Sequence, residues 1–268
     1  LALLFWILFR IPNFSSLTFG QVRDGRGIVI SSPIENVQVY VDGKNVGFAP
    51  FKGILSVDRH TIFAVTTNGL HSEIVHLTVN KGTGLMPELQ MVFHDYVDLG
   101  LPSGTMWATC NVGASSPEEV GEYYAWTETQ PVDENTSANY VYKTKMKNAD
   151  DVAYVEWGPS WQMPSLRDFN ELVDKHYTSC VFTTQNDVKG LLVKSLKNGN
   201  SIFLPAGGFN YDGKVNDVNV VGNYWTSTAG DAFLNGSYQF CFYEDDFFEH
   251  YCDRFLGRSV RPVWKCRE

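Results

Sequence analysis

The chain has 268 residues, of which 44% are hydrophobic and 19% are charged, and its formal net charge is -9. This length and hydrophobic content allow one large core or two smaller ones, and we expect two domains. The acidic balance provides no basic surface that would neutralise phosphates, which argues against nucleic acid as a partner.

The first segment is an apolar run at residues 1–9 that is too short to span a bilayer. The sequence predicts that residues 1–20 are the remnant of a signal peptide, cleaved after Gly20 to leave Gln21 as the mature start. A retained membrane anchor is the alternative. We therefore expect an exported protein, at the cell surface, in the periplasm or secreted, with no stable membrane span after processing.

Residues 21–84 are predicted to form a small all-β module. Valines alternate with other side chains over residues 37–41, and Asp42-Gly43 then supplies the dipeptide that tight hairpin turns favour. Further strands are expected at residues 62–65 and 74–79. The histidines of this module lack metal-ligand spacing, so we interpret them as strand or turn residues.

Four sequence blocks of this module occur together and in order. They are ISSP at 30–33, VYVDGKNVGFAP at 39–50, His60, and Asn-Gly at 68–69. Together they resemble the PEGA domain, a small β-sandwich-like module of bacterial surface and envelope proteins. The resemblance implies a spacer or contact platform and no catalysis.

A second domain is expected to follow a short linker. Glycine and proline over residues 81–87 mark a boundary, and we assign residues 85–92 to the linker and 93–268 to the second domain. Two helices are predicted there, because Ser116 and Ser165 each precede an acidic residue by three positions, as in a capping box. After Ser165 the apolar residues fall on one helical face, so this helix should dock on a core.

The candidate functional segment is an insert at residues 231–255, rich in aromatic and acidic side chains. The apolar-polar alternation breaks at 244–246 and again at 250–253, which favours exposed binding loops over the alternative, two strands with ordinary aromatic packing. Tyrosine and phenylalanine offer large contact areas, and the polar residues add adaptable contacts. The predicted ligand-binding residues are Asn235, Tyr238, Cys241, Tyr243, Asp245, Asp246, Phe248, His250, Tyr251, Cys252 and Asp253.

Six further blocks cover nearly all of the second domain. They are DLGLPSGTMWATCNVGA at 98–114, YAWTET at 124–129, WQMPS at 161–165, NGNSIFLPAGG at 198–208, GNYWTST at 222–228 and RSVRPV at 258–263. In this order they resemble the Fibrobacter succinogenes major paralogous domain. That family implies a C-type-lectin-like fold in the formylglycine-generating-enzyme-like branch. The expected fold class is therefore α+β, a C-type-lectin-like domain preceded by a small all-β, PEGA-like sandwich module.

This family includes variable proteins of bacterial diversity-generating retroelements, in which a mutagenic reverse transcriptase changes adenines of a C-terminal repeat. Randomised adenines in AAT or AAC codons cannot yield Glu, Gln, Lys, Met or Trp. Between Tyr238 and Phe255, the residues outside the reachable set are Gln239, Glu244 and Glu249. The insert is therefore consistent with a diversified face, although relatives without diversification also fit this composition.

No enzymatic motif is evident. The sequence has no nucleophile elbow, no HExxH zinc motif, no phosphate-binding P-loop and no Rossmann fingerprint. We therefore expect a protein that is not an enzyme and that has no cofactor and no bound metal. Two oxygen-rich groups lack EF-hand order, and solvated turns are the favoured interpretation of both. They are Asp245, Asp246, His250 and Asp253 in the insert, and Asp212, Asn216, Asp217 and Asn219 before it.

The five cysteines, at positions 110, 180, 241, 252 and 266, show no zinc spacing, and their odd number leaves at least one unpaired. In an exported protein, Cys110 with Cys180 or Cys241 with Cys252 could be bridged. For the first pair, two small buried side chains are an equally good interpretation.

The sequence thus predicts an exported or surface-displayed binding protein whose C-terminal face recognises an unknown protein or glycan ligand. One alternative is a structural subunit or adhesin of a bacterial surface appendage. The other is a calcium-dependent lectin.

Overall fold

The computed structural model describes residues 25–82, 84–132, 134, 136–230 and 235–265. The chain is mostly β, with 44% strand and 7% helix, arranged as several small antiparallel sheets and two short helices. The predicted signal peptide at 1–20, Cys266 and positions 231–234 of the insert lie outside the described residues.

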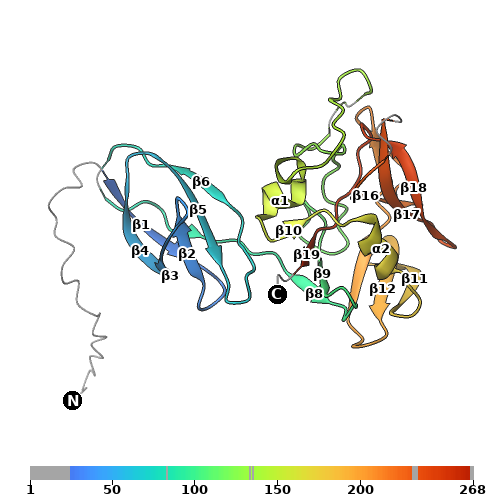
Figure 1. Cartoon of the computed structure of the whole chain (residues 1–268), viewed down its shortest axis with the longest axis horizontal. Helices are drawn as coiled ribbons and strands as arrows, with labels where there is room; N and C mark the ends of the chain where they lie inside the picture. Colours follow the sequence, from blue (N-terminus) through green and yellow to red (C-terminus); the bar gives the residue numbers. More distant parts are fainter. Residues whose placement is uncertain (1–24, 83, 133, 135, 231–234, 266–268) are drawn as a thin grey trace, which may run out of the picture.

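The first module consists of two small sheets that share one core (Figure 1). Strands alternate between core-facing and solvent-facing residues, so β2 buries Val39 and Val41 while β5 buries Ile62 and Ala64. One sheet has the order β4-β1-β7 and the other β3-β2-β5-β6. The strands are β1 (Gly25–Ser31), β2 (Gln38–Val41), β3 (Lys44–Phe48), β4 (Phe51–Ser56), β5 (Arg59–Val65), β6 (Val75–Thr78) and β7 (Leu89–Gln90).

The predicted hairpin in this module is confirmed. Val41 pairs with Lys44, and the two intervening residues, Asp42 and Gly43, have φ angles of 50° and 74°. Positive φ at both central positions is the geometry of a two-residue turn that matches the twist of the flanking strands. The strands predicted at 62–65 and 74–79 correspond to β5 and β6.

The segment predicted as a linker, residues 85–92, belongs to the first module. Strand β7 pairs in parallel with Ile30 and Ser31 of β1, and Met91 is fully buried in the first core. Leu89 and Met91 of this segment pack in that core, so the glycines and the proline over residues 81–87 do not mark a free linker.

His60 of β5 contacts Asp42 in the turn between β2 and β3. The ring Nδ1 lies 2.7 Å from the Asp42 carboxylate, and Nε2 lies 3.0 Å from the Ser56 carbonyl oxygen. Burial alone would lower the pKa of His60. The hydrogen bonds to Asp42 and Ser56 and the charges of Asp42 and Asp58 outweigh it, so the pKa is raised.

This arrangement predicts a pH-dependent stability of the first module. The folded state raises the pKa of His60. The stabilisation by the protonated ring is therefore fully present below the pKa of the unfolded chain, about 6.5, and is lost as pH rises through the pKa of the folded state. Urea unfolding of the wild type and of His60→Gln, compared between pH 5.5 and pH 8.5, should show a stability difference that shrinks as pH rises. A stability difference between the two proteins that does not change with pH would contradict this prediction.

The second module contains four sheets and two short helices (Figure 1). Its sheets have the orders β10-β19-β9-β8, β11-β12-β13, β14-β15 and β16-β17-β18. The elements are β8 (Tyr96–Asp98), β9 (Thr105–Ala108), α1 (Val152–Trp157), β10 (Trp161–Gln162), α2 (Leu166–Leu172), β11 (Thr178–Gln185), β12 (Val188–Ser195), β13 (Ser201–Pro205), β14 (Phe209–Tyr211), β15 (Lys214–Asn216), β16 (Gly222–Ala229), β17 (Gly236–Phe242), β18 (Phe247–Asp253) and β19 (Val263–Lys265), with a 3-10 turn η1 (Asn148–Asp150) before α1.

The two helix predictions had different outcomes. Ser165 caps α2, and Asp168 returns the hydrogen bond to complete the capping box; Phe169 is fully buried in the core, as predicted. The helix predicted after Ser116 is wrong. There the Glu119 carboxylate accepts hydrogen bonds from the backbone N–H and hydroxyl of Ser115, and the chain forms a turn.

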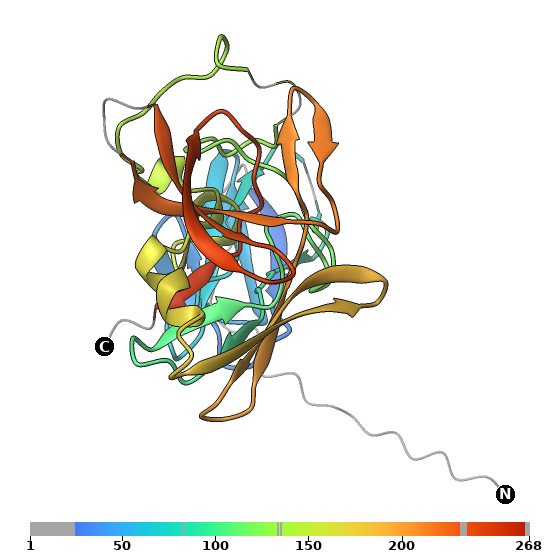
Figure 2. The same cartoon turned by 90° about the vertical axis from the view of Figure 1, so that its right-hand side faces the viewer.

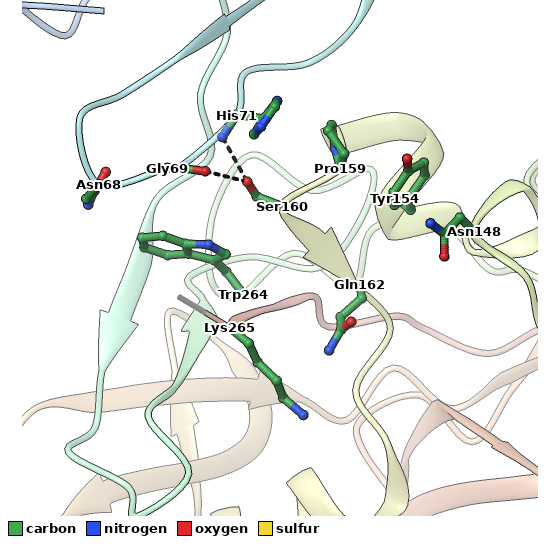
Figure 3. A pocket seen from close by; sticks show the side chains of 10 residues that line it. All are labelled: Asn68, Gly69, His71, Asn148, Tyr154, Pro159, Ser160, Gln162, Trp264 and Lys265. Atoms are coloured by element: carbon green, nitrogen blue, oxygen red, sulfur yellow. Dashed lines mark hydrogen bonds between the residues drawn. The ribbon is translucent and has the colours of Figure 1, made fainter. Parts of the chain in front are cut away.

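The two modules are in contact. Leu70 of the first module is buried in a core cluster with tryptophans of the second. Ser160 joins the modules through two hydrogen bonds, donating to the Gly69 carbonyl at 2.9 Å and accepting from the His71 N–H at 3.0 Å (Figure 3). A cleft of about 490 Å³ opens beside this contact, lined in part by Trp264.

Candidate ligand-binding face

Strands β17 and β18 form a hairpin, so the expectation that the insert consists of loops is wrong. Their register runs from Gly236 opposite Asp253 to Phe242 opposite Phe247. The acidic residues that interrupt the alternation, 244–246, lie in the turn of the hairpin. There the Tyr243 N–H donates to the Asp246 carbonyl at 2.7 Å. The break in periodicity marks a turn between strands and not the end of strand structure.

The hairpin lies at the end of the molecule away from the first module (Figure 1). In the orientation of Figure 2 it is on the side facing the viewer. Strand β17 is the central strand of its sheet and is largely buried, whereas β18 is the edge strand and is largely exposed. The sheet thus presents its outer strand to solvent.

The two faces of the hairpin have different roles. Phe240 and Phe242 belong to the hydrophobic core, and Phe247, opposite Phe242, lies on that side. The opposite face carries Cys241 with Phe248 and Gln239 with His250 as cross-strand pairs. The pleat of the strands therefore sends alternate residues of the insert to the core and to the outer face.

Three rings on the outer face form what we call the aromatic row, Tyr243, Phe248 and His250. Tyr243 and Phe248 are stacked, with ring centroids 5.9 Å apart and planes 18° apart. Phe248 and His250 meet edge to face at 6.2 Å. Tyr243 is 43% exposed and Phe248 38% exposed, so both rings present apolar surface to solvent next to one another.

The eleven predicted site residues differ in their exposure. Seven are exposed: Asn235, Tyr243, Asp245, Asp246, Phe248, His250 and Asp253. Tyr238, Tyr251 and Cys252 are partly buried, and Cys241 is buried. The buried Cys241 does not fit the expectation of an exposed residue, because it lies on the central strand, beside Phe248 of the edge strand.

Tyr251 is part of the frame of the hairpin. Its hydroxyl accepts a hydrogen bond from the Gly236 N–H at 2.9 Å. A Cβ atom at Gly236 or Gly230 would collide with its ring, so these glycines allow the ring to lie against the backbone. Truncating Tyr251 would therefore disturb the hairpin as well as any contact that its ring makes with a ligand.

Two clefts adjoin the aromatic row and share Tyr243 and Phe248. One, of about 210 Å³, is lined on its other sides by Asn223, Gln239 and Arg258, among others. The second, of about 520 Å³, is lined by the acidic turn at 244–246 together with residues of other strands. Two of the row's rings can therefore contact a ligand in either cleft.

Arg258 and Gln239 lie in the smaller cleft and were not predicted. Both are buried, and the Arg258 Nε–H donates to the Gln239 Oε1 at 2.6 Å. The guanidinium carbon also lies 4.7 Å from the centre of the Phe209 ring. In the sequence Arg258 lies inside a block that resembles a structural motif, and no local pattern separates it from the buried Arg261 of the same block.

Cys110, Cys180, Cys241 and Cys252 are free thiols, so neither of the two disulfides considered from the sequence forms. Burial raises the pKa of both Cys241 and Cys252 to about 11. These two thiols are consequently neutral at physiological pH and are poor nucleophiles.

Among the residues that the structure describes, no three His, Cys, Asp or Glu side chains are placed so that they could hold an ion. Asp245, Asp246 and His250 are instead exposed on the hairpin, and Asp212 and Asp217 are exposed near β15.

Comparisons with protein-family models, with curated proteins and with solved structures found no match for this chain. Within the described ranges, no helix combines the length and apolar character needed to cross a membrane.

Proposed function

We propose that this chain is an exported or surface-displayed ligand-binding protein. Its second module, a C-type-lectin-like domain on this proposal, recognises a protein or glycan ligand through the outer face of the β17–β18 hairpin. The observation that carries the proposal is the aromatic row, three rings exposed side by side between two clefts.

The physical argument starts from the cost of exposing such rings. Burying apolar surface contributes about 25 cal/mol per Å² removed from water. The exposed parts of Tyr243 and Phe248 do not make this contribution in the free chain. A partner that covers them gains it. Rings are also held in place by each other and by the strand, so little conformational freedom is lost on binding.

The proposal extends to diversification of this face by a retroelement. In support, the three members of the aromatic row and the acids Asp245 and Asp246 are all reachable by adenine mutagenesis of AAT or AAC codons, and all are exposed. Of the three unreachable residues, Gln239 is buried beside them, whereas Glu244 and Glu249 are exposed. The neighbouring genes test the claim: a reverse transcriptase and a near-identical template repeat that differs only at adenines are expected, and a template with scattered differences would contradict it.

The appendage-subunit alternative predicts that residues 231–255 are buried. Strand β18 instead exposes four consecutive residues, Phe247 to His250, on both of its faces. This exposure favours a recognition role over a packing role for the hairpin.

Binding itself is tested by a screen with an internal control. The wild-type chain and Phe248→Ala are applied in parallel to a glycan array and to solubilised surface proteins of candidate partner cells. A true ligand of this face binds the wild type and loses binding to the variant. Ligands that bind both proteins equally, or whose contacts map to residues 25–82, would overturn the assignment.

A further inference from the structure

Arg258 is a buried cation in the smaller cleft. Arg258 is 4% exposed, and its donors have neutral partners. Nε donates to Gln239, NH1 lies 3.5 Å from the Gly257 carbonyl oxygen, and the Cys252 thiol also accepts from the guanidinium. One face of the guanidinium rests on the Phe209 ring. A guanidinium has five N–H donors in a planar fork, so these partners leave part of the fork unused.

No anion of the chain balances this charge among the described residues. None of their ion pairs includes Arg258. The carboxylate among the lining residues, Asp217, makes no ion pair with it. Cys241 and Cys252 lie close to the guanidinium, but burial raises the pKa of both thiols to about 11, so they provide no thiolate at neutral pH.

A buried, unpaired cation is unfavourable unless something compensates it. The guanidinium remains protonated in proteins, so it cannot relieve this cost by losing its proton. Planar carboxylates match its fork in a bidentate geometry that ammonium groups cannot reproduce. The cleft also places the rings of Tyr243 and Phe248 on the same cavity of about 210 Å³.

We propose that the cleft between Arg258 and the aromatic row is a subsite for a carboxylate attached to an apolar or aromatic group. Arg258 holds the carboxylate, and Tyr243 and Phe248 pack against the group that carries it. The inference rests on the proposed function, since it names the chemistry by which the same face takes hold of its ligand.

The probe is sodium benzoate, with benzamide as its neutral analogue of nearly the same shape. Each is titrated into the full-length ¹⁵N-labelled chain at low ionic strength, and the backbone amide signals of Gln239, Phe248 and Arg258 are followed. Benzoate is expected to shift these signals in a saturable manner, and benzamide to leave them in place. Equal responses to both compounds, or no response to benzoate, would overturn the proposal.

The decisive variant is Gln239→Glu, which keeps the shape of the side chain and supplies Arg258 with an internal carboxylate. Because charge-assisted hydrogen bonds are about twice as strong as neutral ones, benzoate affinity should fall by about tenfold or more. Gln130→Glu adds the same charge at an exposed loop position and should bind benzoate as the wild type does. If the Gln239→Glu variant folds and its affinity for benzoate is unchanged, the proposed subsite is wrong.

The outcomes separate this inference from the proposed function. A face that loses its macromolecular ligand in Phe248→Ala but ignores benzoate retains the function and rejects the subsite. Saturable benzoate binding that Gln239→Glu abolishes, in a chain for which no ligand of the hairpin is found, supports the subsite and counts against the function.

Discussion

Replacing Trp225 by alanine should lower the free energy of unfolding of the second module by about 3 to 5 kcal/mol. The side chain is fully buried in a cluster that includes Tyr124, Trp126 and Val260. Its indole N–H donates to the Tyr124 carbonyl at 2.7 Å, and the Arg258 backbone N–H donates to the same carbonyl at 3.0 Å. The substitution therefore creates a cavity and removes one of the two hydrogen bonds that this acceptor makes. Urea unfolding followed by far-ultraviolet circular dichroism measures the effect.

Two further variants separate the causes. Trp225→Phe keeps a ring in the site and loses the N–H, so its effect should be intermediate. Val260→Ala, at a fully buried position, should destabilise clearly, whereas Val218→Ala, which is 45% exposed, should stay within about 0.5 kcal/mol of the wild type. A loss below about 1 kcal/mol for Trp225→Ala would show that this cluster is not a core.

The elements that were predicted correctly are determined by a few residues that are adjacent in the sequence. The dipeptide Asp42-Gly43 has the backbone preferences that the turn needs, and Ser165 with Asp168 completes a capping box from within one turn of chain. Short helices have little stability of their own, so the same capping-box pattern at Ser116 was not sufficient to form a helix. Gly121, with φ +71° and no room for a Cβ beside the Val112 carbonyl oxygen, ends that segment within five residues.

The candidate face was predictable in composition but not in geometry. Exposure of Tyr243, Phe248 and His250 follows from their place on an edge strand and its turn, and edge position depends on which strands pair, which is a property of the whole fold. The same holds for Arg258, which reaches the cleft from the chain after β18. Its hydrogen bond to Gln239 joins residues 19 positions apart.

Removing the Phe248 ring should weaken binding of the ligand found in the screens by about 1 to 4 kcal/mol and leave the thermal midpoint nearly unchanged. Interface energy concentrates in a few large side chains near the centre of the contact, and Phe248 lies between Tyr243 and His250 and lines both clefts. Calorimetric titration of Phe248→Ala gives the affinity, and a melting curve of the same sample gives the stability.

The neighbouring residue provides the matched control. Phe247 is 36% exposed against 38% for Phe248, but it lies on the Phe240 side of the hairpin and lines neither cleft. Phe247→Ala removes the same ring from the same strand, so any general loosening of β18 affects both variants alike. A binding loss confined to Phe248→Ala assigns the contact to the outer face. Equal losses in the two variants would mean that binding depends on the integrity of the strand and not on the aromatic row.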